Sequence, residues 1–342
     1  MARERLYGKT LEELTAVTTA ASMPLYAAKQ IAGWLYRRGA PEISGMTDLS
    51  LAARNLLQKE YETGLTPPSA VATGSDGTRK YLFPVSNNRF IETAFIPDRN
   101  RATVCLSVQS GCRMGCLFCM TARQGFQGNL TSNEILNQFM SLPEHESITN
   151  IVYMGMGEPL DNLSEVLKSL DILTSAWGYG WSPTRITVST VGITDRIEEF
   201  LEKSKCHLAV SLHSPFDDER QALMPVQRIH PLGRVLDIIR RFDFGRQRRV
   251  SFEYIVFRGL NDSPAHVREM ARILNGIRCR VNLIRFHAIP GSEYTSPDNR
   301  EMESFRDSLN TKGITATIRA SRGEDIGAAC GLLSTIEQNK NR

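Results

Sequence analysis

Long apolar runs are missing from this sequence of 342 residues. A charge-free stretch near its start, Leu14–Ala28, is interrupted by Thr, Ser and Pro24 and falls short of the ~20 apolar residues of a membrane span. It follows Glu12 and Glu13, whereas basic residues precede the apolar core of a signal peptide. We therefore expect a cytoplasmic protein that does not associate with membranes.

The excess of positive over negative charge is also small. Lys and Arg number 41 against 37 Asp and Glu, a net charge of +4. The 41% hydrophobic and 23% charged residues are typical of globular proteins and exclude a disordered or fibrous chain. Much of the excess lies in residues 1–40, which fits a polyanionic partner as well as a solvated helix surface.

The hydrophobic pattern changes twice along the chain. Residues 1–66 contain three helical segments and predict an N-terminal helical domain, whose basic residues make RNA binding a possible role. Residues 67–100 have strand patterns around a Gly-Ser-Asp-Gly turn and predict a short β connector. The last residues, 337–342, are a polar tail.

Strand and helix patterns alternate through residues 101–336. The expected strands lie near 103–109, 149–154, 185–190, 207–213, 249–257, 280–286 and 314–320. Such alternation predicts an α/β fold with a parallel sheet covered by helices. The pattern leaves an open doubly wound sheet, a partial barrel and a closed barrel as alternatives.

Cysteine is sparse except in one place: four of the seven cysteines lie within residues 105–119. In a reducing compartment this crowding indicates metal or redox chemistry rather than disulfides. Cys112, Cys116 and Cys119 form C-x3-C-x2-C directly after the first strand of the alternating region. A structural zinc site normally has four ligands, whereas a four-iron cluster on three thiolates keeps one iron open. Three merely buried cysteines fit this spacing poorly.

Several polar residues and glycines lie at the carboxyl ends of the predicted strands or beyond them: Gly155 to Glu158, Ser189, Ser211 to His213, His287 and, further on, Cys330. The carboxyl ends of parallel strands form one rim, where α/β proteins place their active sites. Taken singly, the serines fit strand ends and His213 fits a core position. Their convergence on one rim predicts an active site there.

Together these motifs resemble the RlmN/Cfr family of radical S-adenosylmethionine (radical SAM) RNA adenine methyltransferases. The resemblance runs from about residue 92 to residue 333 and includes M-G-M-G-E-P at 154–159, S-L-H at 211–213 and S-R-G-E-D-I at 321–326. It implies a partial (β/α)6-type barrel with a [4Fe-4S] cluster on Cys112, Cys116 and Cys119. The implied SAM contacts are Gly157, Glu158, Ser189, Ser211, Leu212, His213 and His287, the last standing where the family usually has asparagine.

The resemblance also implies a mechanism that uses two SAM molecules per turnover. Cys330 would become S-methylcysteine, and its methyl carbon would bond to the adenine in a covalent protein–RNA intermediate. Cys105 would then resolve this intermediate through a transient disulfide with Cys330, and Glu92 would accept the ring proton. By strand parity Glu92 lies with apolar residues, which should raise its pKa as a general base requires. An exposed edge-strand glutamate and a packing role for Cys105 fit the local pattern too.

The motif T-A-R-Q-G-F at 121–126 resembles the branch of the family that methylates adenine C2. The implied substrates are an adenosine at the peptidyl transferase centre of 23S rRNA and the adenosine beside a tRNA anticodon. The implied partners include an electron donor such as flavodoxin, and the chain is expected to be a monomer. Two alternatives remain: a C8 adenosine methyltransferase of 23S rRNA, and a non-catalytic, zinc-stabilised RNA-binding protein.

Overall fold

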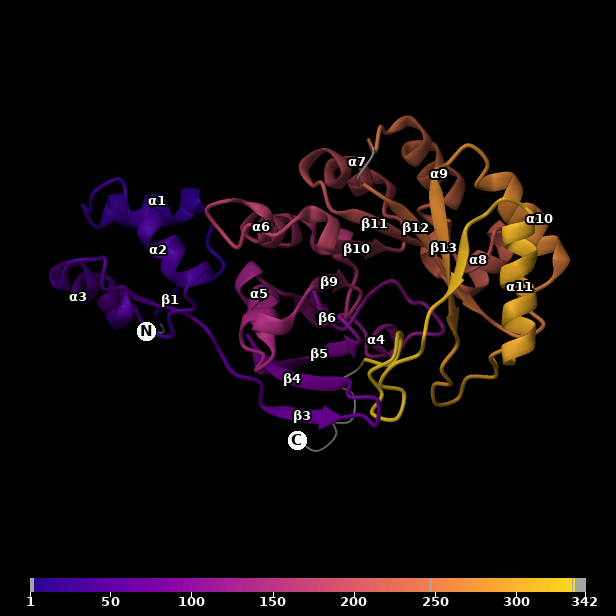
Figure 1. Ribbon diagram of the computed structural model, residues 1–342, viewed down its shortest axis with the longest axis horizontal. Coiled ribbons are helices and arrows are strands. Elements are labelled where there is room, and N and C mark those ends of the chain that lie inside the picture. The colour runs from indigo at the N-terminus through magenta and orange to yellow at the C-terminus, as the bar shows by residue number, and fades with distance from the viewer. Residues whose placement is uncertain (1–2, 246–247, 334, 336–342) are drawn as a thin grey trace.

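A lobe of three helices projects from one end of a larger α/β body (Figure 1). The computed structural model describes residues 3–245, 248–333 and 335. The lobe consists of α1 (Leu11–Ala20), α2 (Ala27–Tyr36), α3 (Leu51–Glu60) and the parallel pair β1 (Glu4–Arg5) and β2 (Tyr61–Glu62). Helix α1 begins at a capping box, in which Thr10 and Glu13 satisfy each other's backbone N–H groups. This local signal determines where the helix starts.

Seven parallel strands form most of one continuous sheet in the body. They are β6 (Arg101–Cys105), β9 (Asn150–Tyr153), β10 (Ile186–Thr190), β11 (His207–Ser211), β12 (Val250–Val256), β13 (Cys279–Arg285) and β14 (Ala316–Ile318). The sheet is open, because β14 lies at one edge and β3 at the other. This arrangement confirms the predicted α/β class and the open, partial form of the barrel.

The strands of residues 67–100 extend the same sheet in antiparallel order. They are β3 (Ala70–Thr73), β4 (Arg79–Val85) and β5 (Arg89–Asp98), and β5 pairs with β6. In this register Lys80 lies opposite Ala94, and Ala94 lies opposite Cys105. Three strands therefore present side chains to one face beside the start of the parallel sheet.

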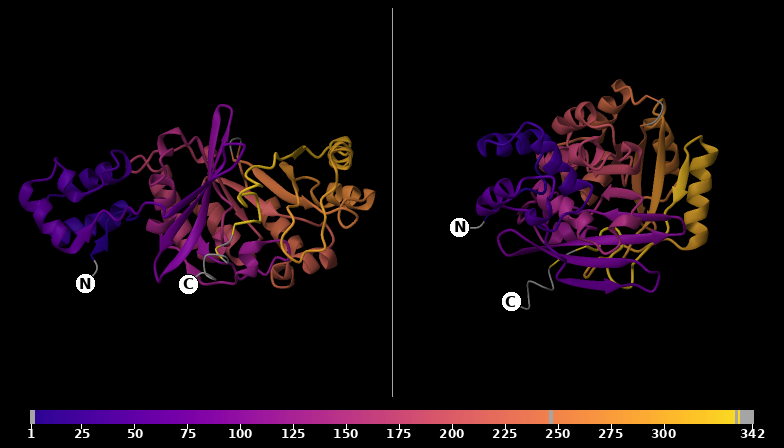
Figure 2. Two further views of the ribbon diagram at one scale, coloured as in Figure 1. Left: turned by 90° about the horizontal axis from the view of Figure 1, so that it is seen from below. Right: turned by 60° about the vertical axis from the view of Figure 1, so that its left-hand side comes forward.

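Helices follow most of the parallel strands and cover the outer face of the sheet (Figure 2). Helix α9, for example, buries an apolar stripe of Leu232, Val235, Leu236 and Ile239, at helical spacing. The helices of the body are α4 (Met120–Arg123), α5 (Ser132–Met140), α6 (Leu163–Thr174), α7 (Thr194–Lys203), α8 (Asp217–Leu223), α9 (Leu232–Arg241), α10 (Pro264–Ile273) and α11 (Asn299–Thr311). A small pair, β7 (Gln109–Ser110) and β8 (Gly128–Asn129), flanks the cysteine loop.

After β14 the chain turns back and lies beside α4 and the turn between β3 and β4 (Figures 1 and 2). The backbone N–H of Met120 donates to the carbonyl of Gly331 (2.8 Å), and that of Ser75 donates to Asp325 Oδ2 (2.8 Å). These contacts hold the segment that carries Cys330 over the rim of the sheet. The predicted polar tail, 337–342, lies outside the described residues. Within the described part of the chain, no helix has the length and apolarity to cross a membrane.

Candidate active site

A cavity opens at the carboxyl ends of the parallel strands, where the sequence predicts the active site. Most of the predicted site residues line it: Cys112, Cys116, Cys119, Gly157, Glu158, Ser189, Ser211, His213 and Cys330. Leu212 is fully buried and is not part of this lining; its backbone N–H donates to the carbonyl of Glu253 (2.9 Å). Because residues alternate in direction along a strand and its extension, Leu212 points into the core while its neighbours face the cavity.

The three cysteines of the motif lie on the loop between β7 and α4, and all three are free thiols. Burial raises the pKa of Cys112 to about 12 and also raises the pKa values of Cys116 and Cys119. Among the described residues, no group of three or more His, Cys, Asp or Glu is placed to hold a single metal ion. A four-iron cluster spaces its cysteine ligands more widely than one ion does, so three soft sulfur donors on one cavity suit such a cluster.

A tight turn after β9 brings Glu158 to the cavity. Gly157 has a φ of +97°, and a Cβ there would lie 2.5 Å from Gln109 Cβ, so only glycine fits. The Glu158 carboxylate accepts hydrogen bonds from Thr190 Oγ1 (2.6 Å), from the N–H of Val191 (2.9 Å) and from the N–H of Leu160 (3.0 Å). Burial nevertheless raises the pKa of Glu158 to about 7. A cationic ligand beside it would favour the ionised form.

His213 is buried and neutral beside the cysteine loop. Its Nδ1 accepts a hydrogen bond from the N–H of Ile255 (3.0 Å), so the neutral ring carries its proton on Nε2. Burial, and then the charge of Arg220, lower the pKa of His213 to about 3. The ring packs edge-on against Phe118, with centroids 4.8 Å apart. His213 is therefore both a core histidine and a part of the cavity wall.

A second cavity adjoins the first and is lined by Cys105, His287, Arg319 and Cys330, among others. Cys330, Arg319 and Met154 belong to the linings of both cavities. Cys330 thus lies between two cavities, one lined by the cysteine loop and the other lined by Cys105. His287 lines only the second of these two, and its Nδ1 is 3.4 Å from Glu324 Oε1.

Cys105 is buried and shares a small apolar cluster with Ala94, Val152 and Ala328. Burial, and then the neighbouring Cys330, raise the pKa of Cys105 to about 12, while the charge of Arg319 acts in the opposite direction. Cys105 therefore packs in the core and also lies beside Cys330. Cys330 itself is exposed, and both thiols are free.

Glu92 is buried on β5 but does not line either of these two cavities. Its carbonyl accepts a hydrogen bond from Ser107 Oγ (2.6 Å), and its Oε1 is 3.0 Å from Lys80 Nζ. Beside the apolar residues of its own strand, Glu92 thus has a charged neighbour, because Lys80 reaches it from the adjacent strand. Periodicity within one strand contains no information about that neighbour.

Sequence reasoning missed Arg319, which lines both cavities. Its Nη1 is 3.3 Å from Glu253 Oε2 and 3.5 Å from Met154 Sδ, and Asn282 Nδ2 donates to Glu253 Oε1 (2.7 Å). These contacts hold a guanidinium beside Cys105 and Cys330. In the sequence, Arg319 could have been identified from its position two residues before the S-R-G-E-D-I motif.

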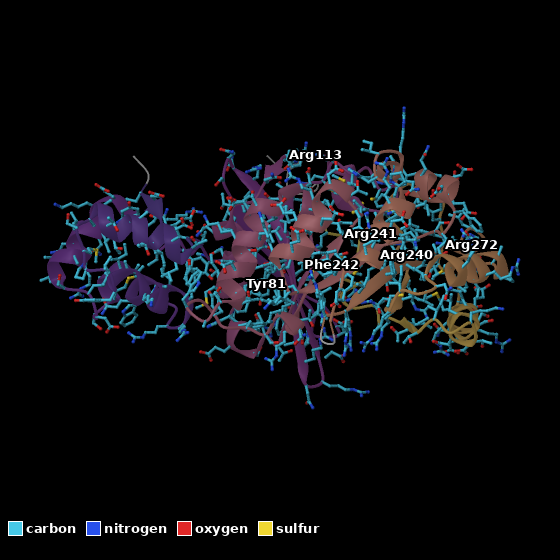
Figure 3. The ribbon with its side chains drawn as sticks, turned by 90° about the horizontal axis from the view of Figure 1, so that it is seen from above. Tyr81, Arg113, Arg240, Arg241, Phe242 and Arg272 are labelled. Atoms are coloured by element: carbon cyan, nitrogen blue, oxygen red, sulfur yellow. The ribbon has the colours of Figure 1, made fainter. Side chains whose placement is uncertain are left out.

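Basic side chains of the α/β body lie in different environments. Arg248 faces the interior, where it donates to the carbonyls of Cys206 (2.9 Å) and Leu201 (2.7 Å), so this side chain has a structural role. Its neighbour Arg246 lies outside the described residues. Figure 3 labels Arg113 of the cysteine loop, which forms an ion pair with Asp161 (2.9 Å). On the outer surface, the same figure shows Arg240 and Arg241 beside Phe242.

Two family models match the sequence. Residues 5–63 match the ribosomal RNA large subunit methyltransferase N-terminal domain, and residues 106–271 match the radical SAM superfamily. The first match covers the helical lobe, and the second covers the cysteine loop and the strands from β9 to β12.

Named relatives match the chain from end to end. A probable dual-specificity RNA methyltransferase RlmN from Parabacteroides distasonis is 56% identical over 98% of each chain. The dual-specificity RNA methyltransferase RlmN from Syntrophus aciditrophicus is 44% identical over 98% of this chain and 97% of its own. The crystal structure of a radical SAM methyltransferase from Sphaerobacter thermophilus superposes with a TM-score of 0.89, at 39% identity, over 96% of this chain and 99% of that one.

Proposed function

Because this chain belongs to the RlmN family of radical SAM RNA methyltransferases, we propose that it methylates adenine C2 in two RNAs. The substrates are an adenosine at the peptidyl transferase centre of 23S rRNA and the adenosine beside the anticodon of tRNA. Support for two RNA classes comes from the relatives, which are named dual-specificity RNA methyltransferases. The single observation that carries the proposal is the place of Cys330, which lines both cavities.

Cys112, Cys116 and Cys119 would hold a [4Fe-4S] cluster, and Gly157, Glu158, Ser189, Ser211 and His213 would bind SAM. When bound, the cluster and two SAM molecules supply a 5′-deoxyadenosyl radical and a methyl group. The carboxylate of Glu158 would accept hydrogen bonds from an ammonium, and His213 Nε2–H would donate one. Leu212, whose backbone N–H and carbonyl are bonded within the protein, would position its neighbours Ser211 and His213. His287 would approach SAM from the second cavity.

The chain's own residues would then carry the methyl carbon to the base. Cys330 would hold it as S-methylcysteine. Loss of one hydrogen atom from this methyl group to the radical would let the carbon bond to adenine C2 and join protein and RNA, and the unpaired electron of the adduct would return to the cluster. Glu92 would accept the C2 proton. The Cys105 thiolate would attack the Cys330 sulfur, so that the sulfur–carbon bond breaks, the carbon keeps the electron pair and takes up a proton to complete the methyl group, and a Cys105–Cys330 disulfide remains. Arg319 would stabilise that thiolate, because its guanidinium lies beside a thiol whose pKa burial raises to about 12.

We assign the helical lobe, residues 1–66, to RNA binding and residues 101–336 to catalysis, with residues 67–100 connecting them. An electron donor such as flavodoxin would reduce the cluster, and the protein would act as a cytoplasmic monomer. Any enzyme that modifies a base edge must take the base out of its stack and hold the backbone nearby. A lobe with several basic side chains at one end of the body is suited to the second task.

The decisive experiment is anaerobic reconstitution followed by methylation of unmodified 23S rRNA and tRNA. Nucleoside mass spectrometry should detect 2-methyladenosine in both RNAs. Formation of 8-methyladenosine would instead identify the C8 alternative. Stoichiometric zinc, without iron, sulfide or methylation, would identify the non-catalytic alternative and overturn the proposal.

A further inference from the structure

A lysine that no sequence motif singled out lies against the buried carboxylate of Glu92. Lys80 is on β4, and its Nζ is 3.0 Å from Glu92 Oε1. The side chains of Lys80 and Glu92 are 20% and 2% exposed, so the pair is largely shielded from water. A buried carboxylate is costly unless a cation or hydrogen bonds compensate for its charge. Lys80 supplies such a cation.

The register of the sheet explains how the two side chains meet. Leu82 lies opposite Glu92, and Lys80, two residues earlier on β4, lies opposite Ala94. Residues two apart on a strand share a face, so Lys80 is the diagonal neighbour of Glu92. Cys105 lies opposite Ala94 on the other side. Lys80, Glu92 and Cys105 therefore come from three adjacent strands to one face of the sheet.

The segment that carries Cys330 covers this same face. Ala328 packs with Ala94 and Cys105, and a Cβ built on Gly327 would lie 3.5 Å from Lys80 Nζ. The lysine ammonium therefore lies between Glu92 and the C-terminal segment. The second cavity, on the Cys105 side of this face, is lined by further titratable or charged side chains, namely Cys105, Cys119, His287, Arg319, Arg322 and Cys330.

We propose that Lys80 is a positioning residue for the proton transfer to Glu92. Its ammonium keeps the Glu92 carboxylate ionised and oriented until the adenine C2 proton is removed. In that step the C2–H bond breaks, an O–H bond forms on Glu92, and the electron pair remains in the adenine ring. Lys80 keeps its own proton throughout. This inference depends on the proposed function, which makes Glu92 the proton acceptor.

The test uses the reconstituted full chain with Lys80→Met, Lys80→Arg and Glu92→Gln. The matched control is Lys203→Met, which removes an ion pair of similar length, Lys203 Nζ to Glu199 Oε1 at 2.9 Å, from the exposed surface of α7. Two quantities are measured between pH 6 and pH 9 in a single turnover. The first is the fraction of protein in a covalent RNA adduct, and the second is the rate at which methylated adenosine forms.

Loss of the ammonium should favour the protonated form of Glu92. An adjacent opposite charge lowers the pKa of a carboxyl group by ~1–3 units, so Lys80→Met should slow methylation severalfold at the low end of the pH range and less at the high end. The adduct should accumulate, and raising the pH to 9 should restore most of the rate. Lys80→Arg should keep most of the wild-type rate, and Lys203→Met should match the wild type.

Methylation of Cys330 itself does not use Glu92, so every variant should still contain S-methylcysteine at that position. A wild-type rate and pH profile in Lys80→Met would overturn the inference. A loss at every pH that arginine does not restore, or loss of Cys330 methylation, would show a structural role instead and would also overturn it. Wild-type turnover by Glu92→Gln would contradict the role of Glu92 in the proposed function. Failure of the proposed function is thereby distinguished from failure of the inference about Lys80.

Discussion

The backbone N–H of Met120 donates a hydrogen bond of 2.8 Å to the carbonyl of Gly331. Met120 directly follows the third cysteine of the loop, Cys119, and Gly331 directly follows Cys330. The bond therefore joins the loop that would hold the cluster to the segment that would carry the methyl group. Thr121 Oγ1, which donates to the carbonyl of Leu333 (2.7 Å), strengthens the same junction.

Cys330→Ala should abolish RNA methylation and leave the cluster in place. The variant removes the proposed methyl carrier but none of the three cysteines of the loop. Iron and sulfide content should equal that of the wild type, while mass spectrometry should find no methylated adenosine. Cys279→Ala is the matched control, because Cys279 is half-buried at the start of β13 and lines neither cavity. Turnover by Cys330→Ala would contradict the mechanism.

Cys105→Ala should trap the covalent protein–RNA intermediate. The Cys330 carbon would still bond to the adenine, but no thiolate would be present to break the sulfur–carbon bond. Denaturing gel electrophoresis of the reaction with labelled RNA should show a shifted protein band. Cys206→Ala controls for the loss of a buried thiol, since Cys206 is fully buried away from both cavities. The resolving role fails if no crosslinked species forms in Cys105→Ala.

Asp325→Ala should loosen the segment that carries Cys330. Asp325 Oδ2 accepts a hydrogen bond from the backbone N–H of Ser75 (2.8 Å), which fastens the segment to the turn between β3 and β4. Since Asp325 is exposed, global stability should fall by only ~1 kcal/mol. Hydrogen exchange should become faster in residues 322–331, and methylation should slow a few-fold. The control Asp307→Ala removes an exposed carboxylate of α11 and should change neither the hydrogen exchange of residues 322–331 nor the rate of methylation. If exchange in these residues is equally slow in both variants, the anchoring role is refuted.

His213 should make stability depend on pH. Burial and the charge of Arg220 lower its pKa to about 3, so the unfolded chain binds a proton that the folded chain excludes. The stabilisation is complete above pH ~6.5 and is lost as the pH falls toward 3. From pH 7.5 to pH 5 the loss should be ~2 kcal/mol. The measurement is the free energy of unfolding in urea, as a function of pH, for the cluster-free protein and for His213→Gln, which lacks the titrating imidazole. If the two free energies change with pH in parallel, the prediction is contradicted.

Some strand ends differ from the sequence prediction for a local reason. The first parallel strand was expected over 103–109, but β6 ends at Cys105. The chain then leaves the sheet while Leu106 and Val108 remain buried, and their N–H groups donate to the carbonyls of Val152 and Met156. An apolar run continues where the strand does not, because a buried loop also needs apolar side chains. Periodicity does not distinguish the two.

The candidate site, too, could be predicted from the sequence only in part. Gly157, Glu158, Ser189, Ser211 and His213 could be placed on one rim from the sequence, since each lies at or just beyond the carboxyl end of a strand and parallel strands end at one edge. His287 could be placed on this rim in the same way, but the sequence could not show that it lines the second cavity rather than the first. Thr190, which donates to Glu158 Oε1 (2.6 Å), was also missed.

By itself the sequence determined the order of strands and helices, the cysteine loop and the family, because these depend on spacing within short segments. Only the tertiary structure decided that Cys330 lies between two cavities and that Lys80 lies against Glu92. Both relationships depend on the register of neighbouring strands and on the return of the C-terminal segment across the sheet. Such contacts join residues far apart in the chain, and one sequence contains no local signal for them.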